Sequence, residues 1–470
     1  MKKGANIMAK HTHVAIDLGA SSGRHVLGWL EDGKIQLKEM YRFENGAAMK
    51  NGFLCWDEKQ LTREVIAGLK ACREAGEMPE TVAIDTWGVD YALLDANGDL
   101  LSDTFAYRDS RTQETWKSLD DDAVYARTGI QPQPFNTIYQ LLADQKDRPE
   151  ALEKADRLLF MPEYLTYRLT GKMENEYTVA STSGLLHAKN RDWDWKLIEE
   201  LKLPKGIFGP LRQPGYEVGY VTEEVEKEIG YKPMILLAPA HDTAAAVLGA
   251  PVEAGDAFLS SGTWSLLGAE IDEPILTRES RLWGLTNEGG VENTYRFLKN
   301  IMGLWIIQSI RRELPGKPSF GEMAAWAKEN EAFSGRIDVD APEFLAPESM
   351  TEAIRDHLKK HDQPLPQNAG ELLSCVNHSL AECYARTIKH LGEVAGKPFK
   401  RLCIVGGGSQ NAFLNELTAK ACGIPVTAGP TEGTAIGNLL SQMIAAGEIA
   451  SVQEARKLLK VSFEIKEVEI

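Results

Sequence analysis

The sequence predicts an α/β protein whose two similar domains face each other across a central cleft. At 470 residues, the chain is longer than one hydrophobic core usually fills. Each half contains, in the same order, a hairpin with a small polar first turn, a helix, and a strand with a glycine-containing exit. The turn-rich segment 251–255 separates the halves. We therefore expect an N-terminal domain at 1–250, a C-terminal domain at 251–450 and a tail at 451–470.

The first half opens as an antiparallel meander. Strands are expected at 14–18, 24–30 and 35–43, because apolar residues dominate or alternate there between turn signals. The glycine- and serine-rich turn 19–23 joins the first two strands. This turn is the first of two that matter for the chemistry.

A helix and another strand follow the meander. Leu61, Val65 and Leu69 recur at helical spacing, which predicts an amphipathic helix over 57–75. The next strand, 81–84, runs directly into a polar exit that contains glycine. This is another polar strand exit in the first half.

Three polar residues near the midpoint, His241, Asp242 and Thr243, lie between two apolar segments. The run 234–237 predicts a buried strand, and 244–248 predicts the start of a helix. In an open α/β sheet, ligands bind at the carboxyl ends of strands, where this aspartate would stand. A helix cap is the alternative interpretation, because Asp and Thr are common cap residues.

The second half repeats the plan of the first. The segment 258–267 is again a strand, a small hydroxyl-rich turn and a strand. A long helix is expected over 371–394, a strand over 401–405 and a further helix over 434–446. The glycine run 406–408 forms the exit of that strand, so the glycine turns of both halves would line the cleft.

Composition narrows the class of protein. With 52 basic and 68 acidic residues, the formal charge is −16, which argues against a long contact with nucleic acid or an anionic membrane. Six cysteines lack metal-binding spacing and are expected to be reduced core residues. We expect a cytoplasmic protein, since no signal or membrane-length apolar segment is visible. His11 and His13 are expected to belong to a frayed leader.

The hydroxyl- and glycine-rich turns suit a phosphate group. Glycine lets the backbone approach closely, and successive amides form an anion-binding nest. Ser21, Ser22 and Thr263 add hydroxyl donors, and Arg24 supplies a local positive charge. A single turn of this kind is usually an ordinary hairpin, but two at matching places favour a phosphate site.

Several other kinds of site are excluded because their sequence signatures are absent or stand in the wrong context. The chain has no Gly-x4-Gly-Lys-Ser/Thr loop, no Gly-x-Gly-x-x-Gly opening a helix, and no His-Glu-x-x-His. The turn 19–23 matches the Gly-x-Ser-x-Gly elbow of hydrolases. That elbow leads into a helix, whereas 24–30 is expected to be a strand, so a serine hydrolase is disfavoured.

Longer motifs carry a family resemblance. The matching stretches are 17–24, 84–90, 106–111, 167–173, 261–264, 286–290, 298–305 and 406–411. In these stretches the chain resembles the FGGY carbohydrate kinases. The resemblance extends over nearly the whole chain, from Val14 to about Ala446.

The resemblance implies a fold and a reaction. Both domains would be actin-like, of the ribonuclease-H type, with ATP and a sugar in the cleft between them. The reaction implied is transfer of the γ-phosphoryl group of MgATP to the 1-hydroxyl of L-rhamnulose, as in rhamnose catabolism. Phosphoryl transfer passes through a loose transition state, in which an oriented carboxylate suffices to take the proton of the attacking hydroxyl.

The resemblance also implies roles for single residues. Asp242 corresponds to the catalytic base, and Asp17 to a carboxylate that helps to hold Mg²⁺. The implied substrate contacts are Gly88, His241, Asp242, Thr243 and Asn300. The implied ATP contacts are Ala20, Ser21, Ser22, Gly23, Arg24, Thr263, Gln308 and Gly407.

Two alternatives stay open at this point. A kinase of the same family could act on another ketose, such as fuculose or xylulose. An actin- or chaperone-like ATPase would instead use the nucleotide to switch binding of a protein partner. For the kinase, the partners expected are a small-molecule sugar and ATP, without nucleic acid or membrane, in a monomer or small homo-oligomer.

Overall fold

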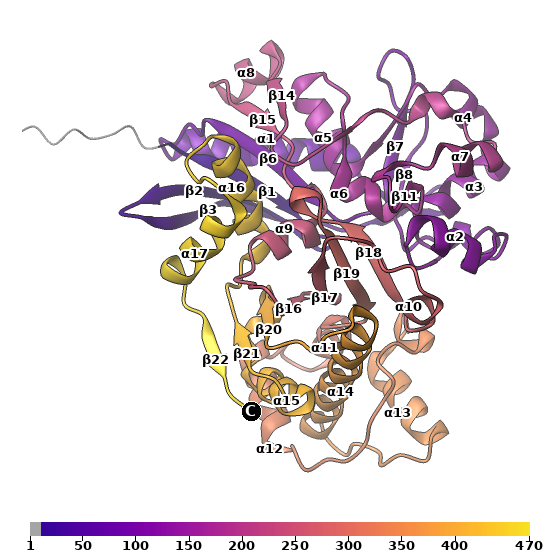
Figure 1. The fold of residues 1–470 in the computed structure, drawn as a ribbon, viewed down its shortest axis with the longest axis vertical. Coiled ribbons are helices and arrows are strands. Elements are labelled where there is room, and N and C mark those ends of the chain that lie inside the picture. The colour runs from indigo at the N-terminus through magenta and orange to yellow at the C-terminus, as the bar shows by residue number, and fades with distance from the viewer. Residues whose placement is uncertain (1–10) are drawn as a thin grey trace, which may run out of the picture.

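The computed structural model describes residues 11–470, and its first sheet lies in the upper half of Figure 1. The six strands in spatial order are β14 (Glu217–Tyr220), β15 (Met234–Leu236), β6 (Thr81–Thr86), β1 (His13–Leu18), β2 (Ser22–Glu31) and β3 (Lys34–Glu44). Strands β15, β6 and β1 run parallel, whereas β1, β2 and β3 form an antiparallel meander. The predicted meander is therefore confirmed.

The second sheet lies in the lower half of Figure 1. Its strands in spatial order are β18 (Leu285–Gly289), β19 (Tyr295–Ile301), β17 (Ser265–Ile271), β16 (Ala257–Ser261), β20 (Leu402–Val405), β21 (Val426–Ala428) and β22 (Lys466–Val468). Strands β16, β20 and β21 run parallel, and β17 and β19 continue antiparallel on the other side of β16.

The two sheets share one topology. In the first, the order β3-β2-β1-β6-β15 places an antiparallel meander beside two parallel strands. In the second, the order β19-β17-β16-β20-β21 does the same. The predicted repeat and the predicted pair of actin-like, ribonuclease-H-type folds are thus confirmed. In both sheets the polar turns follow the central strand, β1 or β16.

Helices cover the sheets, and small strands lie in the loops between them. The helices of the first half are α1 (Glu58–Glu74), α2 (Asp121–Thr128), α3 (Thr137–Asp147), α4 (Pro149–Lys154), α5 (Met161–Thr170), α6 (Tyr177–Ala180), α7 (Trp195–Glu200), α8 (Glu223–Ile229) and α9 (Asp242–Leu248). The small strands are β4 (Ala48–Lys50), β5 (Phe53–Trp56), β7 (Tyr91–Leu94), β8 (Thr104–Phe105), β9 (Arg157–Phe160), β10 (Asn175–Glu176), β11 (Leu186–His187), β12 (Asp192–Trp193) and β13 (Leu211–Arg212).

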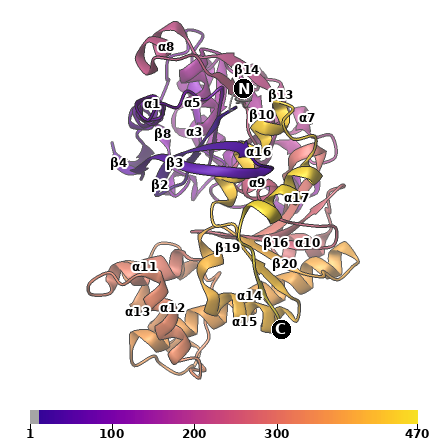
Figure 2. The same cartoon turned by 90° about the vertical axis from the view of Figure 1, so that its left-hand side faces the viewer.

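The later helices belong mostly to the second half. They are α10 (Arg278–Leu282), α11 (Trp305–Glu313), α12 (Phe320–Glu329), α13 (Met350–Lys360), α14 (Ala369–Ala395), α15 (Ala412–Cys422), α16 (Gly433–Ala445) and α17 (Val452–Ser462). Figure 2 shows α11, α12 and α13 gathered at one side of this half, with α14 and α15 beneath the sheet.

Local signals explain where the helices begin and end. Asp57 caps α1 by accepting a hydrogen bond from the backbone N–H of Gln60 at 2.8 Å. The long helix α14 ends at Gly396, whose φ of 69° is left-handed, as a helix-terminating glycine permits. Both helices are confirmed close to their predicted bounds.

Helices α9 and α16 cross in close contact. A Cβ atom on Gly437 would lie 1.7 Å from the backbone oxygen of Ala245, and one on Gly249 would lie 2.0 Å from that of Gly433. Only glycine permits this approach, because the neighbouring atoms are backbone. The crossing brings α16, late in the chain, against β1 and β6 of the first sheet.

The C-terminal tail contacts both sheets. Helix α17 packs on β3, where the backbone N–H of Ile35 donates to Ser462 Oγ at 2.9 Å. Strand β22 then pairs antiparallel with β21 of the second sheet. Figure 1 shows α16 and α17 in yellow beside β2 and β3, and β22 below them.

The expectation of a frayed leader is wrong for His13. This residue begins β1 and is fully buried. Its Nδ1 lies 2.7 Å from Thr81 Oγ1 and its Nε2 lies 2.6 Å from Glu448 Oε1. His11 precedes the strand and is exposed, with its Nδ1 2.9 Å from Glu80.

Two predictions about composition can be compared with the structure. All six cysteines are free, and Cys422 alone is not fully buried. Within residues 11–470, no helix has both the length and the apolar character needed to cross a membrane.

Candidate active site

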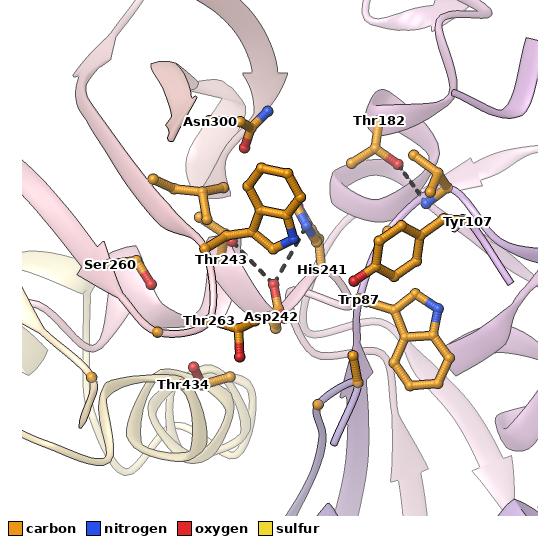
Figure 3. Close-up of a pocket in the computed structure, with 18 of the residues that line it drawn as sticks. Trp87, Tyr107, Thr182, His241, Asp242, Thr243, Ser260, Thr263, Asn300 and Thr434 are labelled. Carbon is orange, nitrogen blue, oxygen red and sulfur yellow. Dashed lines mark hydrogen bonds and ion pairs between the residues drawn. The ribbon is translucent and has the colours of Figure 1, made fainter. Parts of the chain in front are cut away.

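A cavity of about 430 Å³ lies at the carboxyl ends of the parallel strands, between the two sheets. Eleven of the predicted site residues line it: Asp17, Ala20, Ser21, Arg24, Gly88, His241, Asp242, Thr243, Thr263, Asn300 and Gly407. Figure 3 shows His241 and Asp242 between a wall with Trp87, Tyr107 and Thr182 and a wall with Asn300, Ser260 and Thr263.

Three predicted ATP contacts, Ser22, Gly23 and Gln308, are not among the lining residues. Ser22 and Gly23 begin β2, and a Cβ atom on Gly23 would lie 2.3 Å from the ring of Phe43. Gln308 lies in α11, behind the second turn, with its Oε1 3.5 Å from Thr263 Oγ1. These three therefore lie beside lining residues without lining the cavity themselves, and their contact with ATP stays a prediction.

Three aspartates end adjacent parallel strands. Asp17 and Asp85 are register partners on β1 and β6, and Asp242 follows β15, the next strand of the sheet. Asp17 accepts from Arg24 through one oxygen: Arg24 Nε and Nη2 lie 2.9 and 2.6 Å from Asp17 Oδ2. Carboxyl groups are thus concentrated at this edge of the sheet.

Asp85 lies next to Asp17 in the sheet without lining the cavity, and sequence reasoning did not single it out. It is fully buried, and its Oδ2 accepts a hydrogen bond from Asn438 Nδ2 at 2.6 Å, while Oδ1 has no hydrogen-bond partner within residues 11–470. Burial, followed by the negative charge of Asp17, raises its pKa well above the usual value for aspartate. The available signal was its place in the polar exit of the strand 81–84.

Asp242 is the first residue of α9 and points into the cavity. Its Oδ1 accepts a hydrogen bond from Thr243 Oγ1 at 3.0 Å and lies 3.4 Å from His241 Nε2. The side chain stays 34% exposed. Burial raises the pKa of Asp242, and the hydrogen bonds that it accepts from Thr243 oppose the shift. The group is a carboxylate of increased basicity beside open space.

The loop before Asp242 is fixed by a buried carboxylate. Glu176 is fully buried, and its Oε2 accepts from the backbone N–H of Ala240 at 3.2 Å and from Thr178 Oγ1 at 2.7 Å. The carbonyl of Ala240 in turn accepts from the backbone N–H of Thr86 at 2.9 Å. These bonds fix the backbone before Asp242 at the edge of the sheet. They do not fix the side-chain torsions of Asp242.

The polar exit of β6 carries a backbone outlier beside the cavity. Val89 has a φ of 66°, a left-handed conformation that is strained for a β-branched residue. Its N–H donates to Thr182 Oγ1 at 3.0 Å, and its carbonyl accepts from Thr137 Oγ1 at 2.7 Å. A Cβ atom on neighbouring Gly88 would lie 2.8 Å from Thr182 Oγ1. Two threonines therefore hold a strained turn in the cavity wall.

Asp90 organises the aromatic part of the same wall. Its Oδ2 accepts from Trp56 Nε1 at 2.7 Å, from Trp87 Nε1 at 3.0 Å and from the backbone N–H of Tyr107 at 3.0 Å. Burial raises the pKa of Asp90 to about 6, and these bonds oppose the shift. Trp87 is packed against Trp56 and also lines the cavity.

Further lining residues were not predicted as site residues. They include Tyr107, Gln131, Gln133, Phe135, Asn136, Thr182, Thr286, Glu288, Thr431 and Glu432. Tyr107, Thr286 and Glu288 lie in stretches that carry the family resemblance, which is the signal that could have found them. The others lie in loops without a local pattern.

The opposite part of the cavity is built from backbone turns. In the first turn, the N–H of Gly19 donates to the carbonyl of Ser22 at 2.9 Å, and in the second, Gly262 donates to Trp264 at 2.9 Å. Beside them, a Cβ atom on Gly407 would meet no atom within 4 Å. Such turns present amide groups to an anion and leave room for it.

The geometry combines a basic carboxylate with two amide-lined turns, one from each half. The two halves are matched separately by two domain models of one known family. The N-terminal domain model of the FGGY family of carbohydrate kinases matches residues 12–249, and the C-terminal domain model matches residues 257–446. The chain belongs to the FGGY family of carbohydrate kinases. It is therefore an ATP-dependent sugar phosphotransferase.

The similarity to individual FGGY kinases extends over nearly the whole chain. A rhamnulokinase of Bacillus subtilis (strain 168) is 43% identical over 460 residues, which cover 97% of this chain and 94% of that protein. A rhamnulokinase of Oceanobacillus iheyensis is 41% identical over 457 residues, 96% of this chain and 97% of that protein.

Solved structures of more distant kinases share the fold. A ligand-bound xylulose kinase from Lactobacillus acidophilus superposes with a TM-score of 0.81 at 17% identity, over 98% of this chain and 94% of that one. Plasmodium falciparum glycerol kinase with ADP gives a TM-score of 0.75 at 14% identity, over 98% of this chain and 94% of that one. At such identities the likeness concerns the fold alone.

Proposed function

We propose that this kinase transfers the γ-phosphoryl group of MgATP to the 1-hydroxyl of L-rhamnulose, giving L-rhamnulose 1-phosphate and ADP, as a step of rhamnose catabolism. The choice of sugar is supported by the relatives named rhamnulokinase, which are 41–43% identical over almost the full chain. We propose that the protein is located in the cytoplasm, where ATP is available. We also propose a monomer or small homo-oligomer, with the boundary between the two domains near residue 250.

The position of Asp242 is the observation that carries the reaction. Its carboxylate stands in the cavity between the polar and aromatic wall and the two turns. As the bond between the sugar oxygen and the γ-phosphorus forms, the bond from phosphorus to the β-phosphate oxygen breaks and ADP leaves. The hydroxyl proton passes to the Asp242 carboxylate. General base help of this kind typically contributes 10²–10⁴-fold, and positioning supplies most of the remainder.

We assign the remaining residues to the two substrates. Gly88, His241, Thr243 and Asn300 would contact the sugar, where amide and imidazole groups suit its hydroxyls. Ala20, Ser21, Arg24, Thr263 and Gly407 would contact ATP. Ser22, Gly23 and Gln308, next to these residues, are proposed as further ATP contacts.

The carboxylate donors fit a hydrated magnesium ion. Within residues 11–470, no group of three or more His, Cys, Asp and Glu side chains is arranged to enclose a metal ion. Mg²⁺ prefers one or two carboxylates together with phosphates and water. Both bonds from Arg24 end on Asp17 Oδ2, which leaves Oδ1 for such an ion. When bound, the ion would offset the charge of the phosphates.

A coupled assay of ADP release tests the proposal. The purified chain is supplied with MgATP and, separately, with L-rhamnulose, L-fuculose or D-xylulose. We expect a large stimulation by L-rhamnulose and a 1-phosphate product identified by NMR. Stimulation by a different ketose would retain the mechanism and replace the sugar. ATP hydrolysis indifferent to every sugar would contradict the kinase and favour a nucleotide-driven switch.

A further inference from the structure

A buried ion pair lies directly behind His241. Glu288 and Arg296 are cross-strand partners on β18 and β19, and Arg296 is fully buried. Arg296 Nη1 lies 3.0 Å from Glu288 Oε2, and Arg296 Nε donates to the carbonyl of Gly289 at 2.8 Å. Burial alone would raise the pKa of Glu288, but the positive charge of Arg296 outweighs it and the net pKa is lowered. The pair is therefore ionised and fixed in place.

Arg296 also reaches the imidazole of His241. Its Nη1 lies 3.1 Å from His241 Nδ1. A guanidinium group carries only donors, so Nδ1 must accept this bond through its lone pair. The neutral ring then carries its proton on Nε2, the nitrogen that faces Asp242 Oδ1 at 3.4 Å.

Glu288 offers His241 a competing arrangement. Its Oε2 lies 3.3 Å from Nδ1, and a proton on Nδ1 would point toward that oxygen. The same proton would also face Arg296 Nη1 at the shorter distance of 3.1 Å, where two donors repel. Arg296 Nη1 gives its hydrogen bond to Nδ1 and holds Glu288 through charge: Nη1 and Oε2 lie 3.0 Å apart as an ion pair, and within residues 11–470 Oε2 has no hydrogen-bond partner. The arrangement with the lone pair on Nδ1 leaves no two donors opposed.

We infer that Arg296, held by Glu288, is a positioning residue that fixes His241 with its proton on Nε2 and thereby orients the carboxylate of Asp242. This inference rests on the proposed function, in which Asp242 takes the proton of the sugar hydroxyl. Both contacts of that carboxylate, with His241 Nε2 and Thr243 Oγ1, involve Oδ1. The proton of the sugar is therefore taken by Oδ2.

This group of interacting side chains includes residues from both halves of the chain. His241 and Asp242 belong to the stretch matched by the N-terminal family model, and Glu288 and Arg296 to the stretch matched by the C-terminal one. Arg296→Lys would keep the charge beside Glu288 but lose the planar fork that serves Nδ1 of His241 and the carbonyl of Gly289 at once. The orientation of the base thus depends on a side chain from the other half.

Nitrogen NMR of the full-length protein tests the tautomer without any turnover. The chain contains nine histidines, so a sample labelled with ¹⁵N-histidine is compared with its His241→Gln variant, in which the signals of His241 are missing. At neutral pH we expect a protonated Nε2 and an unprotonated Nδ1 for His241. A proton on Nδ1, alone or together with one on Nε2, would overturn the inference.

Kinetics of Arg296→Lys test the consequence. We expect kcat for the sugar to fall by roughly ten- to a hundredfold, as for other residues that orient a reacting group, with KM for MgATP within twofold of the parent. The matched control is Arg401→Lys, because Arg401 pairs with Asp256 at 2.6 Å at the far end of β20. We expect no change of kcat in that control.

The outcomes separate this inference from the proposed function. If the parent protein phosphorylates none of the ketoses, the proposed function fails, whereas the tautomer still reports on Arg296. If the parent is active but Arg296→Lys keeps full kcat, the inference fails alone. Should Arg296→Lys fail to fold by circular dichroism, the NMR result on the parent protein decides.

Discussion

Arg24 of β2 and Glu432, the residue before α16, form an ion pair across the nucleotide side of the cavity. Arg24 also donates two hydrogen bonds to Asp17. The guanidinium group is thus held by two carboxylates. A phosphate that uses Arg24 must compete with at least one of them.

Replacing Glu432 with glutamine is expected to tighten ATP binding. The side chain is 37% exposed, so the pair contributes no more than about 1 kcal/mol, and the expected gain in affinity is on the order of fivefold. Calorimetry at low and high salt measures the change, which should shrink as salt screens it.

The matched control for this prediction is Glu416→Gln. Glu416 pairs with Lys328 at 2.8 Å and is 38% exposed, but it lies in α15 rather than on the cavity. Unchanged or weaker ATP binding by Glu432→Gln, relative to this control, would show that Glu432 does not restrain Arg24.

Asp242→Asn is expected to abolish phosphoryl transfer. The amide keeps the shape of the carboxylate but accepts no proton, so kcat should fall by at least about 10²–10⁴-fold. Binding of ATP and sugar should stay measurable by calorimetry. Near-normal turnover would remove Asp242 from the role of base, and Asp147→Asn, an exposed aspartate of α3, is the control.

The pH dependence of kcat/KM follows from the environment of Asp242. Burial raises the pKa of this carboxyl above its ordinary value of 3.8. Because only the ionised form takes a proton, activity should fall as the pH is lowered through that raised pKa, while it is retained above it. The acid limb is therefore expected above pH 3.8, with circular dichroism to verify folding. An acid limb at or below that pH in folded protein would contradict the assignment.

Gly437→Ala is expected to destabilise the fold. The added Cβ atom would lie 1.7 Å from the backbone oxygen of Ala245, and backbone can move away only by separating α9 from α16. Overpacking of this kind costs roughly 1–3 kcal/mol, so the thermal midpoint should fall by several degrees. Gly321→Ala in α12 is the control, since its Cβ would meet only Ser319 Oγ at 4.0 Å. Equal midpoints for both variants would refute the steric argument.

Local signals in the sequence predict most of the secondary structure and the core of the site. The cap at Asp57 and the terminating Gly396 are visible within a few residues of the helices they bound. The two polar turns and Asp242 are recognisable because polar residues follow apolar strands. Physical chemistry of short stretches suffices for such features.

Features that depend on distant partners were missed. The buried carboxyl group of Asp85 accepts its hydrogen bond from Asn438, which is 353 residues further along the chain. His13 looked like part of a polar leader, but Thr81 and Glu448 supply its partners inside the fold. The role argued for Arg296 likewise requires His241, which precedes α9 and lies 55 residues earlier in the chain. No local pattern contains that information.

The packing of the last helices against the first strands has a consequence for how the protein is made. Val26 and Ile35 of the first sheet share one hydrophobic cluster with Leu439 of α16 and Leu459 of α17. During synthesis, the N-terminal part leaves the ribosome long before those helices exist. One apolar face of the nascent meander therefore stays exposed until α16 and α17 have been synthesised, and a ribosome that stalls before them would release a chain prone to aggregate.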